Sequence, residues 1–193
     1  MNEDKRQDAF LEENPHLGPQ GDEEERYYET WVAVTGHRPP KIGGYDGKSP
    51  LRLLVNRKLE KVIVSINKEE WDRPKQTVLI TGGALGVDTD AAFIAAKNRI
   101  PYIVAVPCND HSKMWPKHAR EEYQHMLNFS RKVEVIHKGE YHRLCMQQRN
   151  MWMIDHCDKL IAVWDGSSGG TANCVKYAQD QGKEIIFINL DKE

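Results

Sequence analysis

The chain alternates two hydrophobic patterns, and each predicts a different secondary structure. Short, continuously apolar runs predict buried strands at residues 31–35, 77–81, 100–106, 133–136, 159–164 and 184–190. Alanine-rich segments, or segments with apolar residues three and four positions apart, predict helices at residues 51–66, 85–98, 117–129, 142–157 and 170–181. Prolines and glycines separate these elements, and we expect Pro107 to end the third strand.

The order of these elements predicts the fold class. Strands alternate with helices, and a strand that is apolar at consecutive positions is typical of a sheet covered on both faces. Right-handed crossovers then give an α/β fold, a Rossmann-like, doubly wound and mostly parallel sheet with helices on both faces. Ligands of such sheets bind beyond the carboxyl ends of the strands.

The charge of the chain is unevenly distributed. The 193 residues have a formal net charge of −2, yet residues 1–26 hold nine acidic and three basic residues. Residues 27–193 hold 20 acidic and 24 basic residues, a net charge of +4. We therefore expect an acidic, flexible tail at 1–26 and one folded domain at 27–193. The tail is interpreted as a solubilising extension. The alternative is a segment that covers a basic site or docks on a partner.

The composition excludes several classes of protein. The near-neutral charge argues against a generally basic nucleic-acid binder, and no apolar run of about 18 residues predicts a membrane span. The acidic N-terminus lacks the apolar segment of a secretory signal. Four cysteines without short spacing predict buried free thiols in a reducing cytoplasm and argue against a zinc site. We expect neither a metal nor a cofactor.

Three loops that follow predicted strands carry the candidate chemistry. They run from Thr35 to Arg38, from Thr81 to Asp88, and from Asp165 to Asn173. Glycines let backbone N–H groups approach an anion, and a helix N-terminus adds unpaired donors and a positive dipole end. The loops therefore predict a phosphate cradle, although the GxGxxG and GxxxxGK[ST] fingerprints are absent.

The side chains of these loops have distinct expected roles. Arg38 pairs with phosphate, while Asp88 and Asp165 accept hydrogen bonds from sugar or base and are the candidate catalytic acids. Arg149 and Asn150 either bridge structural elements or reach the site. The candidate ligand-binding residues are Thr35, Gly36, His37, Arg38, Gly82, Gly83, Ala84, Gly86, Asp88, Asp165, Gly166, Ser167, Ser168, Gly169, Gly170, Thr171 and Asn173.

Other conspicuous residues are interpreted as structural. His111, His118 and His125 lie seven residues apart, which is not the spacing of a helical metal pair, so we expect surface or loop histidines. Three tryptophans could either stack on a nucleobase or pack in the core, and we prefer the core. They are Trp115, Trp152 and Trp164.

These motifs together resemble the SLOG superfamily of Rossmann-like proteins, which includes the YspA/YpsA-like proteins, the LOG phosphoribohydrolases and the DprA-like proteins. The resemblance rests on VAVTGHRPPKIGGY, TVLITGGALGVDTDAA and QQRNMWMIDHCDKLIAVWDGSSGGTANCVKYA, within residues 32–178. It is strongest for the YspA/YpsA-like branch, with its Thr-Gly-His-Arg and Gly-Gly-Ala-x-Gly-x-Asp elements. The resemblance implies self-association, as a homodimer or a higher homo-oligomer, and a nucleotide or nucleotide-derived ligand such as an ADP-ribose-type compound or a nucleoside phosphate.

One departure from the LOG enzymes favours binding over turnover. Those enzymes cleave the base–ribose bond of nucleoside monophosphates and carry a Pro-Gly-Gly-x-Gly-Thr-x-x-Glu motif. Here Cys174 stands three residues beyond the threonine, in place of the glutamate, and the proline is also missing. We expect a protein that senses or sequesters a nucleotide-type ligand. A nucleotide N-glycosidase is the first alternative, and a DprA-like binder of single-stranded DNA is the second. The acidic tail argues against nucleic acid.

Overall fold

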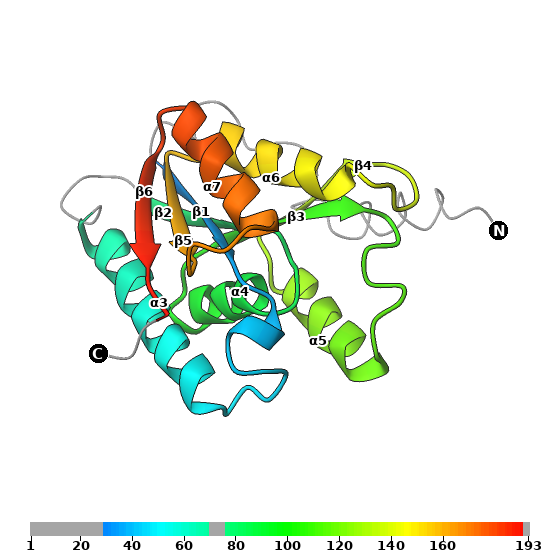
Figure 1. Cartoon of the computed structure of the whole chain (residues 1–193), viewed down its shortest axis with the longest axis horizontal. Coiled ribbons are helices and arrows are strands. Elements are labelled where there is room, and N and C mark those ends of the chain that lie inside the picture. The colour runs from blue at the N-terminus through cyan, green and yellow to red at the C-terminus, as the bar shows by residue number, and fades with distance from the viewer. Residues whose placement is uncertain (1–28, 70–75, 191–193) are drawn as a thin grey trace.

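A six-stranded sheet organises the chain, and every pair of neighbouring strands in it is parallel (Figure 1). The structure is a computed structural model that describes residues 29–69 and 76–190. The strands are β1 (Glu29–Gly36), β2 (Gln76–Thr81), β3 (Tyr102–Cys108), β4 (Lys132–His137), β5 (Lys159–Val163) and β6 (Glu184–Ile188). Their order across the sheet is β4-β3-β2-β1-β5-β6.

Helices cover both faces of this sheet (Figure 1). One face carries α3 (Pro50–Glu69), α4 (Val87–Lys97) and α5 (Lys117–Asn128), and the other carries α6 (Cys145–His156) and α7 (Gly170–Asp180). A short 3-10 helix, η2 (Pro39–Lys41), follows β1. The predicted Rossmann-like α/β fold class is therefore confirmed.

The central strand shows why the apolar runs are continuous. Val32 and Val34 of β1 point into one hydrophobic cluster, which includes side chains of α3 and α4. Ala33, between them, points to the opposite cluster, which includes side chains of α6 and α7. All three residues are fully buried. Because successive side chains of a strand point to opposite faces, a sheet with two cores needs apolar residues at consecutive positions.

The strand order creates a switch point between β1 and β5. From β1 the chain winds through β2 and β3 to β4 on one side, then crosses to β5 and β6 on the other side. The connections leaving β1 and β5 therefore diverge to opposite faces of the sheet. A crevice opens beyond the carboxyl ends of such strands, and this is where doubly wound sheets bind ligands.

Two expectations differ from the structure or lie outside it. Pro107 does not end the third strand, because β3 continues to Cys108. Proline is tolerated there because β2 pairs with β3 only as far as Val104, so no β2 ladder bond is lost beyond that residue. The predicted tail at 1–26 lies outside the described residues.

All four cysteines are free and buried, as predicted. No helix in the described ranges has the length and apolarity to cross a membrane.

Candidate functional site

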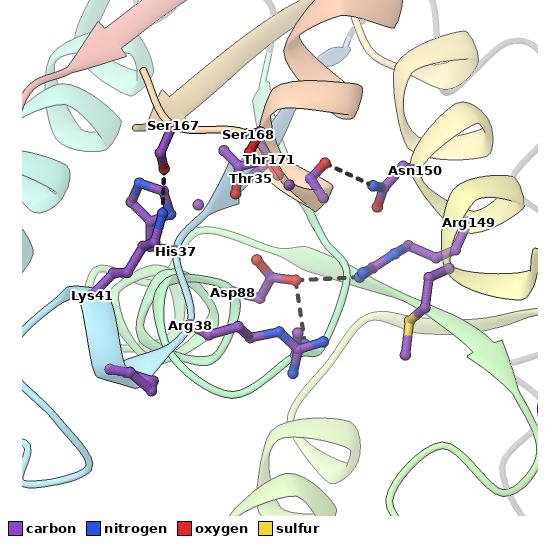
Figure 2. Close-up of a pocket in the computed structure, with 16 residues that line it drawn as sticks. Thr35, His37, Arg38, Lys41, Asp88, Arg149, Asn150, Ser167, Ser168 and Thr171 are labelled. Atoms are coloured by element: carbon purple, nitrogen blue, oxygen red, sulfur yellow. Dashed lines mark hydrogen bonds and ion pairs between the residues drawn. The ribbon is translucent and has the colours of Figure 1, made fainter. Parts of the chain in front are cut away.

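A cavity of about 470 Å³ lies at the switch point, beyond the ends of β1 and β5 (Figure 2). Its volume is in the range of small-molecule sites, roughly 300–1,000 Å³. Segments far apart in the sequence form its wall. The lining residues are Thr35, Gly36, His37, Arg38, Pro40, Lys41, Ala84, Asp88, Met146, Arg149, Asn150, Ser167, Ser168, Gly169, Gly170 and Thr171.

The N-terminus of α7 forms one wall of this cavity. The helix starts at Gly170, and Gly169 before it provides no side-chain cap. The first N–H groups of a helix have no partner within the helix, so these donors are available to a ligand. The amide of Asn150 on α6 donates to the carbonyl of Gly170 at 3.4 Å and ties the two helices together. The arrangement favours an anion at the start of α7.

The N-terminus of α4, in contrast, already has a carboxylate of its own. Asp88 lies in the first turn of α4, and its Oδ2 accepts a hydrogen bond from the backbone N–H of Ala84 at 3.3 Å. The N–H of Val87 donates to the carbonyl of His37 at 3.3 Å. A second anion at this end would meet the charge of Asp88. Of the two predicted glycine loops, the one before α7 is therefore better suited to phosphate.

Arg149 reaches the cavity from α6 and is held against Asp88 (Figure 2). Its Nη1 donates to Asp88 Oδ2 at 3.2 Å, and both side chains are more than nine-tenths buried. The guanidinium lies directly over Gly82, where a built Cβ would be only 1.2 Å from Nη1. Gly82 is thus required for the close approach of this arginine.

Basic side chains outnumber acidic ones on the cavity wall. Arg38, Lys41 and Arg149 line it together with a single carboxylate, that of Asp88. Arg149 is paired with Asp88, and Lys41 contacts the Asp165 carboxylate at 3.7 Å. The exposed guanidinium of Arg38 makes no ion pair with any residue that the structure describes, which leaves it available to a bound anion.

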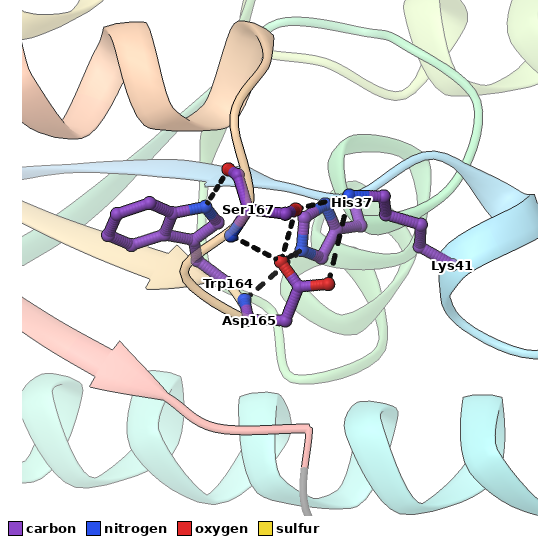
Figure 3. A network of polar contacts seen from close by, with 5 residues as sticks. All are labelled: His37, Lys41, Trp164, Asp165 and Ser167. Carbon is purple, nitrogen blue, oxygen red and sulfur yellow. Dashed lines mark hydrogen bonds and ion pairs between the residues drawn. The ribbon is translucent and has the colours of Figure 1, made fainter.

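A polar network at the cavity wall shapes the loop that follows β5 (Figure 3). Asp165 Oδ1 accepts from the backbone N–H of Ser167 at 2.9 Å and contacts the Ser167 hydroxyl and His37 Nε2, the latter at 2.8 Å. The indole of Trp164 donates to the Ser167 carbonyl at 2.8 Å. Lys41 also contacts the Ser167 hydroxyl. The loop before α7 is therefore fixed in place before any ligand binds.

Two pKa shifts follow from this network. Hydrogen bonds from Ser167, and then the proximity of His37, hold the pKa of the Asp165 carboxyl well below its usual range. Burial lowers the pKa of His37, although the neighbouring Asp165 acts in the opposite direction. Near neutral pH, His37 is therefore a neutral ring and Asp165 a carboxylate, and the pair anchors the loop.

The structure brings most of the predicted site residues together. The cavity wall includes residues 35–38, Ala84, Asp88, residues 167–171 and both Arg149 and Asn150. Six predicted residues do not line it, namely Gly82, Gly83, Gly86, Asp165, Gly166 and Asn173. Gly86 has a positive φ of 102°, and a built Cβ would lie 2.6 Å from the His37 carbonyl, so it serves loop packing.

Sequence reasoning missed three lining residues and one buried histidine. Pro40 and Lys41 line the cavity and lie within the segment VAVTGHRPPKIGGY, but they were not among the candidate ligand-binding residues. Met146 also lines the cavity and lies outside the three segments that carry the resemblance. His111, expected on the surface or in a loop, does lie in a loop but is only 8% exposed. Its neighbours Trp115 and Tyr123 enclose it. Within the described residues, no group of three or more His, Cys, Asp or Glu side chains is arranged to hold a metal ion.

Solved structures with a similar fold include two DNA processing proteins. The chain is similar to DNA processing protein A (DprA) of Streptococcus pneumoniae, with a TM-score of 0.58 and 18% identity. The match covers 82% of this chain but spans only half of that longer protein. DprA of Helicobacter pylori gives a TM-score of 0.57 and 22% identity, over 86% of this chain and 68% of that chain. These likenesses support the fold.

Comparisons of sequence identify the family. The chain is 37% identical over 149 residues to the uncharacterized SPbeta prophage-derived protein YoqJ of Bacillus subtilis, which covers 68% of this chain and 84% of YoqJ. The model of the YspA SLOG family matches residues 32–192, nearly the whole range that contains the sheet and the cavity. The resemblance inferred from the sequence motifs is confirmed, and the chain belongs to the YspA SLOG family.

Proposed function

We propose that this protein binds a nucleotide or a nucleotide-derived compound in the cavity between β1 and β5, as a sensor or sequestering protein. One observation carries the proposal: the uncapped N-terminus of α7 opens into a cavity whose basic side chains outnumber its single carboxylate. Backbone donors at Gly170 and Thr171 receive the phosphate, and Arg38 supplies the charge that is still unpaired.

The polar groups around this phosphate position fit a sugar attached to it. Asp88 Oδ1 and the hydroxyls of Ser168 and Thr171 are hydrogen-bonding groups on the cavity wall. A carboxylate accepts hydrogen bonds from ribose hydroxyls but repels phosphate. The opposite charges of Asp88 and of the α7 N-terminus therefore orient a sugar phosphate, with its anionic end toward α7.

The N-glycosidase alternative lacks an acid at the position where the LOG enzymes carry glutamate. Cys174 occupies that position, one turn into α7, and it is fully buried. Burial raises the pKa of its thiol to about 12, so it provides neither an acid nor a base near neutral pH. Asp88, the carboxylate nearest to a bound sugar, is engaged with Arg149. These features support binding over turnover.

Binding of single-stranded DNA is the second candidate, and the fold likeness to DprA favours it. A single-stranded DNA binding mode has been described for the Helicobacter pylori protein. This likeness opposes our argument from the acidic tail against nucleic acid as a partner. Arg149 and Asn150, which resemble an Arg-Asn element of DprA-like proteins, do line the cavity here. An oligonucleotide needs several phosphate contacts, so its affinity would fall steeply as salt is raised.

Mass spectrometry of small molecules released from the purified, denatured protein tests the proposal. We expect a phosphate-containing nucleotide compound that is depleted in Gly170→Asp and retained in Gly170→Asn, which has the same shape without the charge. Calorimetry with nucleoside monophosphates and ADP-ribose, and fluorescence anisotropy with a labelled thymidine 20-mer, complete the test. Binding of the oligonucleotide alone would replace our proposal with the DNA alternative, and binding of none would refute both.

A further inference from the structure

Unpaired buried polar atoms are concentrated at one place behind the cavity. In the described ranges, six buried side-chain polar atoms lack a hydrogen-bond partner, and four of them belong to three neighbouring residues. They are Nδ1 and Nε2 of His111, the hydroxyl of Tyr123 and Nε of Arg149. The three side chains are 8%, 6% and 6% exposed. Because proteins rarely leave such groups unpaired, a cluster of them points to a partner that arrives from outside the chain.

His111 lies in the loop of residues 109–116, between β3 and α5. Its ring meets Trp115 edge to face, with centroids 4.9 Å apart, and meets Tyr123 of α5 at 5.7 Å. Trp115 and Tyr123 also contact each other, at 5.2 Å. The loop leaves the carboxyl end of β3, at the same edge of the sheet as the cavity. We call these three residues the aromatic cluster.

The aromatic cluster borders the cavity across the turn Gly82–Gly83. A Cβ built on Gly83 would lie 3.2 Å from Cε2 of Tyr123, and one built on Gly82 would lie 1.2 Å from Nη1 of Arg149. Tyr123 therefore packs against Gly83, and Arg149 packs against the adjacent Gly82. Since Arg149 also lines the cavity, its guanidinium joins the phosphate site to the aromatic cluster.

The donors and acceptors of the cluster match a nucleobase better than a second phosphate. Burial, followed by the charges of Arg149 and Arg38, lowers the pKa of His111 to about 3, so the ring is neutral. A contact of the ring with the backbone of Gly83 acts in the opposite direction, but its geometry is too poor for a full hydrogen bond. A neutral imidazole has one donor and one acceptor, a tyrosine hydroxyl offers both, and Arg149 Nε is a donor. A phosphate only accepts, whereas the edge of a base presents donors and acceptors side by side. Flat rings also provide a surface on which a base stacks.

We propose that His111 and Tyr123 form the base-recognition part of the ligand site, with the base held between the Gly82–Gly83 turn and the loop of residues 109–116. This inference rests on the proposed function, because it assumes a nucleotide whose phosphate lies at α7. The base reaches these buried atoms by displacing the loop. This movement separates His111 and Trp115 from Tyr123, because their ring contacts hold the loop against the core. The tip of the loop, Met114, is 89% exposed and adds no further anchor.

Calorimetry that compares nucleotides with a base-free ligand tests the inference. AMP, GMP, CMP and UMP are titrated beside ribose 5-phosphate, and the ratio of the tightest nucleotide affinity to that of ribose 5-phosphate measures base recognition. His111→Phe and Tyr123→Phe keep the rings but remove the polar atoms. Thr77→Val is the matched control, because the Thr77 hydroxyl is also buried without a partner. Thr77 lies near the amino end of β2, at the end of the strands opposite to the cavity.

We expect the ratio to exceed 10 in the wild type and to fall at least fivefold in both aromatic variants. Affinity for ribose 5-phosphate should stay within twofold, and Thr77→Val should change neither quantity. Both aromatic variants should melt at or above the wild-type temperature, because each loses an unpaired buried polar group. A wild-type ratio near one, an unchanged ratio in the variants, or a parallel loss of both ligands would overturn the inference. Failure of the folded wild type to bind any of these ligands or ADP-ribose would refute the proposed function as well.

Discussion

Replacing Gly82 by alanine tests whether Arg149 is positioned by the glycine turn. The new Cβ would lie 1.2 Å from Nη1 of Arg149, 2.2 Å from its Cζ and 2.7 Å from Oδ2 of Asp88. Gly82 does not have a positive φ, so alanine adds no backbone strain. The nearest atoms are at the end of a flexible side chain, and we therefore expect Arg149 to move while the sheet stays intact.

The magnitude follows from the contact that is lost. The hydrogen bond from Arg149 to Asp88, 3.2 Å long and more than nine-tenths buried, involves two charged groups. Such bonds contribute about 1.5–3 kcal/mol, and we expect the free energy of unfolding to fall by that order. If Arg149 also makes one bond of this kind to the ligand, nucleotide affinity should fall roughly 10- to 150-fold.

Urea unfolding and calorimetry with the tightest-binding nucleoside monophosphate measure the two effects. Gly47→Ala is the control, because a Cβ at that exposed glycine meets nothing within 4 Å. A double-mutant cycle with Arg149→Met identifies the cause, since Gly82→Ala should cost no further affinity once the guanidinium is gone. Wild-type affinity in Gly82→Ala, or additive losses of affinity in the double mutant, would show that Gly82 does not position Arg149 for binding.

Three further predictions concern the anion site, acid stability and turnover. Gly170→Asp should lower nucleotide affinity, measured by calorimetry, at least tenfold. Its melting temperature should not fall, because a Cβ at residue 170 meets nothing within 4 Å and an acidic residue is favourable at a helix N-terminus. An equal loss of affinity in Gly170→Asn would contradict a charge effect. Because the pKa of His111 is about 3 in the folded protein, against 6.5 for an unperturbed histidine, the unfolded chain takes up the proton first. Protonation of His111 in the unfolded chain therefore lowers the free energy of unfolding only below pH 6.5, by up to about 1.4 kcal/mol per pH unit. In urea unfolding between pH 7.5 and 4.5, the free energy of unfolding of His111→Phe should fall less with acid than that of the wild type. An equal dependence on pH in the two proteins would argue against a buried neutral ring. Incubation with nucleoside monophosphates, NAD or ADP-ribose should release no free base on chromatography, and release that is lost in Asp88→Asn would show that the protein is an enzyme.

The fold could be predicted because its determinants are local. The consecutive apolar residues Val32, Ala33 and Val34 require two cores, and that requirement is visible in the sequence. The expectation that Pro107 ends β3 is wrong because a strand tolerates proline where its neighbouring strand makes no ladder bond, and β2 stops pairing with β3 at Val104. Where β2 stops pairing depends on how the whole sheet assembles, so the sequence around Pro107 does not show it.

The candidate site could be predicted only in part, for a related reason. The glycine loops are recognisable because helix starts and strand ends follow the local pattern. The sequence does not show that Asp88 occupies the N-terminus of α4 or that Arg149 lies over Gly82, since both depend on how α6 packs on the sheet. The burial of His111 likewise depends on α5, which places Tyr123 beside it.

The most direct test of the central claim is a titration of the 15N-labelled protein with AMP, followed by two-dimensional NMR. We expect saturable shifts that are largest for the backbone amides of Gly170 and Thr171 and for the side chain of Arg38, and we expect these shifts to be lost in Gly170→Asp. Absence of shifts at millimolar nucleotide, or shifts confined to residues away from the β1–β5 switch point, would contradict it.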